Sequence, residues 1–142
     1  MIKLISVDGM LGPANYWLLN DSAPELLSKI CNGCGSKGVG GYIIPDTICG
    51  VSITAACSIH DFMYASGLTI KDKYIADCTL LENTKMCIQK QAKWYQKPIA
   101  YGLAYVYYYS VKKKGLEYFA AASLPEDVVD FLSIDNFDSK LH

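Results

Sequence analysis

The sequence contains no arginine, so its positive charge comes entirely from 13 lysines. Together with 14 acidic residues they give a formal net charge of −1, which offers no electrostatic reason to expect a nucleic-acid partner. Long polar tracts are missing too, because 51% of the residues are hydrophobic and only 19% are charged. This composition excludes a disordered chain, and 142 residues suit one domain with a full hydrophobic core.

Long hydrophobic runs are also absent. The longest uncharged run with helical character covers residues 98–111, whereas a membrane-spanning helix needs about 20 residues. A signal-peptide pattern is missing from residues 1–20, because Asp8 interrupts the apolar run that follows Lys3. We therefore expect either a secreted or periplasmic protein whose leader has been removed, or a protein that stays inside the cell.

Six cysteines form an even set in a short chain, which is typical of a disulfide framework. Three bridges among six cysteines can connect in 15 ways, so composition leaves the pairing open. The cysteines are Cys31, Cys34, Cys49, Cys57, Cys78 and Cys87.

Charge is unevenly distributed along the second half of the chain. Residues 71–114 carry a net charge of +6, and residues 115–142 carry −5. The basic segment suits either an anionic surface or a solvated helix face that pairs with the acidic tail. The pairing with the tail is the preferred interpretation.

The pattern predicts a mainly α fold, since it shows no internal repeat and no strong strand alternation. Six glycines and one proline within residues 31–50 indicate a loop. We expect one domain over residues 1–142, with a core motif region at 31–97 and a C-terminal helical extension at 98–142. Helices are predicted over residues 22–30, 51–65, 71–96, 99–114 and 123–132.

A reactive face is predicted on the helix over residues 51–65. At 100° per residue, Cys57, His60, Asp61 and Tyr64 fall within an arc of roughly 100°. A buried His–Asp pair is costly unless it has partners, and a second carboxylate, Asp77, lies in an apolar stripe of the next helix that starts at Tyr74. His60 can act as a general base, with Asp77 holding its imidazole in one tautomer and Tyr64 binding Asp77.

The glycine-rich loop adds a possible metal site. Its backbone carbonyls, together with the Asp61 carboxylate, can form a site for Ca²⁺, which takes six to eight oxygen ligands. A metal that polarises a carbonyl beside a base that activates water indicates metal-assisted ester hydrolysis.

These motifs resemble secreted phospholipase A2 over residues 31–90. The resemblance is carried by Gly33-Cys34-Gly35, then Cys57-x-x-His60-Asp61-x-x-Tyr64, then Ala76-Asp77. It implies two long antiparallel disulfide-linked helices beside a calcium loop. It also implies calcium-dependent hydrolysis of the sn-2 ester of glycerophospholipids at a phospholipid membrane surface.

The resemblance assigns a role to each matching residue. His60 matches the catalytic base, Asp77 the carboxylate behind it, and Tyr64 the tyrosine bonded to that carboxylate. Asp61 matches the bidentate calcium ligand. Cys34 and Cys57 match the pair whose disulfide ties the loop to the helix. The carbonyls that complete the calcium site are matched by Gly33, Gly35 and Lys37.

Several positions depart from the family pattern. Ala56 and Ala76 stand where family members usually have cysteines, so the other four cysteines inherit no bridges. Lys37 replaces a usual glycine, which leaves Gly38 as an alternative carbonyl donor, and the connection from Cys34 to Cys57 is longer than usual. A catalytically inactive phospholipase-like module that binds lipid or protein is therefore the alternative function.

Two other patterns allow different interpretations. Cys31-x-x-Cys34 with Cys78 and Cys87 is a possible zinc site, but the spacing of the second pair is poor. Tyrosines recur at helical spacing in the helix over residues 99–114, either as a core stripe, which is preferred, or as a lipid-contacting interfacial face. They are Tyr101, Tyr105, Tyr108 and Tyr109.

Overall fold

The computed structural model describes residues 3–31 and 47–141, with side chains up to residue 133. Within these ranges the fold is mainly helical, as predicted, with seven helices and two short antiparallel strand pairs. The elements are β1 (Leu4–Val7), β2 (Met10–Pro13), α1 (Ala14–Ser22), α2 (Pro24–Leu27), β3 (Thr47–Ile48), β4 (Val51–Ser52), α3 (Thr54–Ser66), α4 (Ile70–Gln91), α5 (Lys97–Lys114), α6 (Leu116–Ala121) and α7 (Glu126–Leu141).

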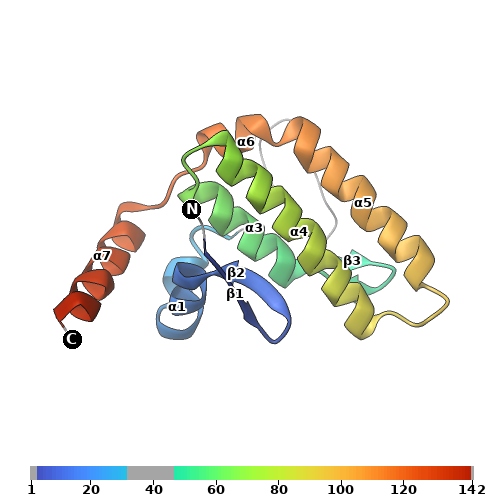
Figure 1. The fold of residues 1–142 in the computed structure, drawn as a ribbon, viewed down its shortest axis with the longest axis horizontal. Coiled ribbons are helices and arrows are strands. Elements are labelled where there is room, and N and C mark those ends of the chain that lie inside the picture. The colour runs from blue at the N-terminus through green and yellow to red at the C-terminus, as the bar shows by residue number, and fades with distance from the viewer. Residues whose placement is uncertain (1–2, 32–46, 142) are drawn as a thin grey trace.

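Helix α4 is the centre of the fold and lies between α3 and α5 (Figure 1). A capping box starts it: the Thr69 hydroxyl accepts the Asp72 backbone N–H, and the Asp72 carboxylate accepts the Thr69 N–H. Helices α3 and α4 run antiparallel, because His60 lies opposite Asp77 and Tyr64 lies opposite Lys73 one turn away. The antiparallel pair predicted from the sequence is therefore present.

The buried surface of α4 differs from the single stripe that the sequence predicts. Tyr74, expected inside that stripe, is 57% exposed, whereas Ala76, Leu80 and Asn83 are buried. The physical reason is that α3 and α5 cover two different sides of α4, so burial does not follow one 3.6-residue stripe. The buried surface of α4 also contains polar residues. The Asn83 amide donates to the Leu11 carbonyl and accepts the Leu11 N–H, both at 2.7 Å, and these bonds connect β2 to α4.

The N-terminal hairpin was not predicted. Strands β1 and β2 pair antiparallel from Leu4 opposite Pro13 to Val7 opposite Met10. Asp8 and Gly9 form the turn with φ of 52° and 85°, the left-handed region that a glycine adopts at no steric cost. Strand β1 is largely exposed, so it lacks the apolar alternation by which a strand is recognised.

Helix boundaries shift where turns replace helix. The predicted helix over residues 71–96 ends at Gln91, and α5 begins at Lys97 after a turn. Pro98 sits in the first turn of α5, where its missing N–H has no intrahelical acceptor to lose. Helix α6 was not predicted, and α7 extends beyond residue 132 to Leu141.

The tyrosines of α5 do not form a core stripe. The buried residues of this helix are Ala100, Ala104 and Val111, while Tyr105 and Tyr109 are exposed. Small side chains face α4 because the two helices pack closely, and the tyrosines are directed to its flanks and outer side. The preference for a core stripe was therefore wrong for these two tyrosines.

Within the described residues, no disulfide joins the two long helices α3 and α4. Both cysteines of α4 are free thiols: Cys78 lies 3.9 Å from the Tyr108 hydroxyl on α5, and Cys87 lies 4.0 Å from the Met10 sulfur on β2. Neither thiol is therefore bonded to a cysteine of α3. The Cys34–Cys57 pair remains a prediction, since Cys34 lies outside the described residues.

In the described ranges, no helix is both long and apolar enough to cross a membrane.

Candidate functional site

Helix α3 presents His60 and Tyr64 toward α4. Its other sides are buried in the core through Ile59, Phe62 and Met63, each 1% exposed or less. Because His60 and Tyr64 are four residues apart, they stack on one side of the helix, with ring centroids 4.1 Å apart. Packing of the apolar sides thus fixes the direction in which the polar side points.

Asp77 of α4 meets both of these side chains. Its Oδ1 lies 2.9 Å from His60 Nε2 and accepts a hydrogen bond from the Tyr64 hydroxyl at 2.6 Å. All three residues are buried: Asp77 is 2% exposed, and His60 is 7% exposed. The structure therefore brings together the three residues to which the sequence assigned catalytic roles.

Lys73 is a fourth member of this cluster, and sequence reasoning missed it. Its Nζ donates to Asp77 Oδ2 at 2.7 Å and to the Val111 carbonyl at 3.4 Å. Lys73 is itself 7% exposed, so this is a buried ion pair that also links α4 to α5. The i,i+4 spacing of Lys73 and Asp77 was the available signal, because such pairs meet on one helix face.

The cluster keeps Asp77 ionised. Burial alone would raise the pKa of Asp77, but hydrogen bonds from His60, Lys73 and Tyr64 outweigh it and hold the pKa below its ordinary value. An ionised carboxylate can only accept hydrogen bonds, so Nε2 carries the proton of the neutral imidazole. The other ring nitrogen, Nδ1, is then unprotonated, and its lone pair can take a proton.

The junction of α5 and α6 covers Tyr64. A Cβ placed on Gly115 would lie 2.4 Å from both the Tyr64 hydroxyl and the Val111 carbonyl oxygen. Phe119 of α6 adds an edge-to-face contact with the Tyr64 ring at 5.4 Å between centroids. Glycine is therefore required at position 115 for the backbone to approach the phenol.

Asp61 follows His60 in the sequence but acts on a different residue. It is half-buried and lies close enough to Cys31 to affect that thiol. Burial, then the charge of Asp61, raises the pKa of Cys31 to about 12, against the lowering effect of its hydrogen bond to Ser58. His60 and Asp61, although adjacent in sequence, therefore have separate surroundings.

Only one residue of the predicted calcium site, Asp61, is among the described residues. Asp61 is a described carboxylate of the type that Ca²⁺ prefers, but Gly33, Gly35 and Lys37 lie outside the described residues, as does Gly38. Among the described residues, no group of three or more His, Cys, Asp or Glu side chains is close enough to hold a metal ion. Calcium binding therefore depends on backbone carbonyls of residues 33–37 and stays a prediction.

Comparisons with protein-family models, curated proteins and solved structures found no match to this chain.

Proposed function

We propose that this chain is a carboxylic ester hydrolase in which His60 is the general base. The observation that carries the proposal is the buried 2.9 Å contact between His60 Nε2 and the ionised Asp77. The resemblance to secreted phospholipase A2 suggests the substrate, the sn-2 ester of a glycerophospholipid.

The chemistry follows from the orientation of the imidazole. Nδ1 of His60 takes a proton from a water molecule as the water oxygen attacks the ester carbonyl carbon. The tetrahedral intermediate then collapses, the bond to the alcohol oxygen breaks, and the imidazolium returns the proton to that oxygen. Asp77 stabilises the imidazolium during this cycle, and Tyr64 and Lys73 hold the carboxylate in position.

Calcium is proposed as the cofactor, with Asp61 as its carboxylate ligand and the carbonyls of Gly33, Gly35 and Lys37 completing the site. Bound there, the ion would polarise the ester carbonyl. This assignment follows the resemblance, and Asp61 fits it as a half-buried carboxylate that is separate from the His60–Asp77 pair.

The test is release of fatty acid from phospholipid vesicles in millimolar Ca²⁺, compared with the same reaction in chelator. We expect His60→Gln to lower the rate at least about 100-fold, because a positioned general base contributes on the order of 10²–10⁴. His142→Gln, at the only other histidine, is the matched control and should keep full activity.

Circular dichroism melting curves must show that both variants fold. The proposal fails if the unmodified protein releases no fatty acid from vesicles and no acid from a simpler ester. It also fails if His60→Gln remains as active as the control.

Binding without catalysis is the second candidate function. The observation that favours it is the buried Lys73–Asp77 ion pair, because Lys73 neutralises the charge with which Asp77 would stabilise an imidazolium. A folded but inactive protein that still binds vesicles or a protein partner would support this function.

A further inference from the structure

The outer side of α5 is apolar and aromatic, although it is exposed. Ile99, Tyr105, Val106 and Tyr109 are between 42% and 66% exposed, and at 100° per residue they share an arc of roughly 120°. Figure 1 shows α5 at the outer edge of the helical array, with α4 on its inner side. We call these four residues the α5 outer face.

Two more aromatic residues extend this surface at its start. Trp94 is 83% exposed and Tyr95 is 53% exposed, in the turn that leads into α5. Their rings make an edge-to-face contact at 5.7 Å between centroids, and Lys93 lies over the Tyr95 ring. Of the thirteen large hydrophobic side chains that are exposed among the described residues, six therefore lie between Trp94 and Tyr109.

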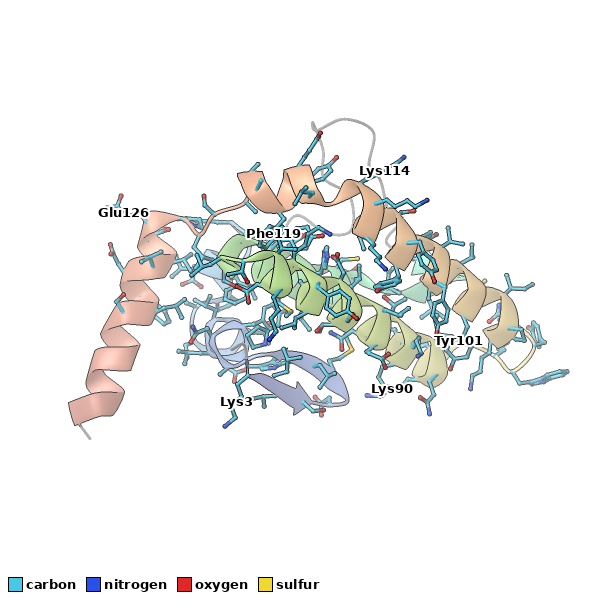
Figure 2. The ribbon with its side chains drawn as sticks, turned by 45° about the horizontal axis from the view of Figure 1, so that its top comes forward. Lys3, Lys90, Tyr101, Lys114, Phe119 and Glu126 are labelled. Carbon is cyan, nitrogen blue, oxygen red and sulfur yellow. The ribbon has the colours of Figure 1, made fainter. Side chains whose placement is uncertain are left out.

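The surface is also basic at both ends. From residue 83 to residue 116 the chain has seven lysines and no aspartate or glutamate. Lys93 lies before the start of the α5 outer face, and Lys112 to Lys114 lie at its end, where Figure 2 labels Lys114. Positive charge is therefore present at both ends of the α5 outer face.

Within the described residues these lysines have no acidic partner. No ion pair joins Lys93, Lys97 or the lysines at 112–114 to any side chain within residues 3–31 and 47–133. In the described part of the acidic tail, Asp127 pairs with Lys29, and Figure 1 shows α7 and α5 at opposite ends of the molecule. The expected pairing of the basic segment with the acidic tail is therefore not found in the described residues.

We propose that the α5 outer face, with Trp94 and Tyr95, docks on the surface of a bilayer that contains anionic phospholipid. Tyrosine and tryptophan suit the headgroup boundary, where the ring meets the acyl region and the polar atom meets water. Lysines at both ends place their ammonium groups at the level of the phosphates. The absence of acidic residues over residues 83–116 favours a uniformly anionic partner over a protein surface of mixed charge.

The docking surface is separate from the residues of the proposed hydrolase activity. Lys73 and Val111 connect the inner side of α5 to the His60–Asp77 cluster, whereas the docking residues lie on its outer side. Vesicle binding by His60→Gln is therefore expected to equal that of the unmodified protein, whatever happens to ester hydrolysis. Failure of one proposal can thus be distinguished from failure of the other.

The experiment measures co-sedimentation of the full chain with vesicles of phosphatidylcholine, with and without phosphatidylglycerol. We expect binding to the anionic vesicles that weakens as salt is raised, because salt screens the lysines. Val106→Asp and Lys113→Glu should each lower the partition coefficient at least about fivefold, since one lysine near an anionic surface contributes about this factor.

Each variant has a matched control at another exposed helical position. Val129→Asp on α7 repeats the valine change at a residue 44% exposed, and Lys71→Glu repeats the charge reversal on α4. Both controls should bind like the unmodified protein.

A blue shift of tryptophan fluorescence on adding anionic vesicles should disappear in Trp94→Phe.

The proposal is overturned if the unmodified protein does not bind anionic vesicles under low salt. It is also overturned if the control variants lose as much binding as Val106→Asp and Lys113→Glu, or if Trp94→Phe keeps the full fluorescence shift. Binding to an acidic protein in place of vesicles would assign the surface to a different partner.

Discussion

The interface between α3 and α4 and the outer side of α5 use the same kinds of residue in opposite environments. Tyr64 and Lys73 are buried at the interface, and both contact one carboxylate, Asp77. Tyr109 and Lys113 lie on the outer side of α5, where they are exposed. Tyrosine and lysine therefore form a closed cluster in one region and an open surface in the other.

Burial explains the difference. A charge removed from water must be compensated by partners inside the protein, so Lys73 has a position determined by Asp77 and by the Val111 carbonyl. A lysine in water needs no such partner, and Lys113 is free to meet one outside the molecule. The closed cluster suits chemistry on a proton, and the open surface suits binding.

The largest predicted effect is at the closed cluster. Asp77→Ala leaves Lys73, His60 and Tyr64 without their common acceptor, so we expect a loss of about 3–5 kcal/mol in the free energy of unfolding. Lys113→Ala should change it by less than about 0.5 kcal/mol. Urea unfolding followed by circular dichroism gives both values.

Replacing Lys73 by Met tests whether the loss at Asp77 arises from uncompensated charge. After Lys73→Met the Asp77 carboxylate keeps its hydrogen bonds with His60 and Tyr64, whereas after Asp77→Ala the Lys73 ammonium keeps only the Val111 carbonyl, so Lys73→Met should cost less than Asp77→Ala. Equal costs for Asp77→Ala and Lys113→Ala would contradict the account of the cluster.

Two glycines test the difference between the closed cluster and the open surface: Gly115 at the end of α5 lies against the cluster, and Gly102 lies within α5. Gly115→Ala forces a methyl group against the Tyr64 hydroxyl and the Val111 carbonyl, and we expect a loss of about 1–3 kcal/mol. Gly102→Ala meets nothing within 4 Å and improves helix propensity, so it should stabilise the protein by about 0.5–1 kcal/mol. Thermal melts of the two variants should shift in opposite directions; a shift in the same direction would contradict the close approach at Gly115.

The smallest predicted effect is on the pH dependence of stability. The folded state lowers the pKa of Asp77, so its stabilising contribution is complete above the unfolded pKa of about 4 and is lost as pH falls through the folded value. The difference in urea midpoint between the unmodified protein and Asp77→Asn should stay constant from pH 7 to about pH 4 and shrink below it. A difference that already shrinks near pH 6 would contradict a lowered pKa.

Much of the site could be predicted from the sequence. The spacing of His60 and Tyr64 places them on one side of a helix, and a carboxylate in an apolar stripe, Asp77, needs partners that such a side can supply. Their contact is confirmed by the structure. Their catalytic roles, the calcium site and the relation to phospholipase A2 remain predictions. The calcium site depends on residues 33–37, and the catalytic roles depend on an activity that only an assay measures.

The misses share a physical cause. Lys73 was overlooked because a lysine is normally solvated, and only the approach of α5 with the Val111 carbonyl buries it. The β1–β2 hairpin has no apolar alternation by which it could be recognised. It is held to α4 by hydrogen bonds between Leu11 and Asn83, which lie 72 residues apart in the sequence. The free thiols of Cys78 and Cys87 contact α5 and β2, and the number of cysteines in a sequence cannot predict such contacts.

The sequence by itself determined the helical class and the side of α3 that carries His60 and Tyr64, because both depend on local spacing along the chain. It also determined that residues 83–116 are basic and free of acid. Tertiary structure decided which lysine is buried against Asp77 and which tyrosines of α5 are exposed. Those outcomes depend on which helices pack side by side, and burial is a property of that packing.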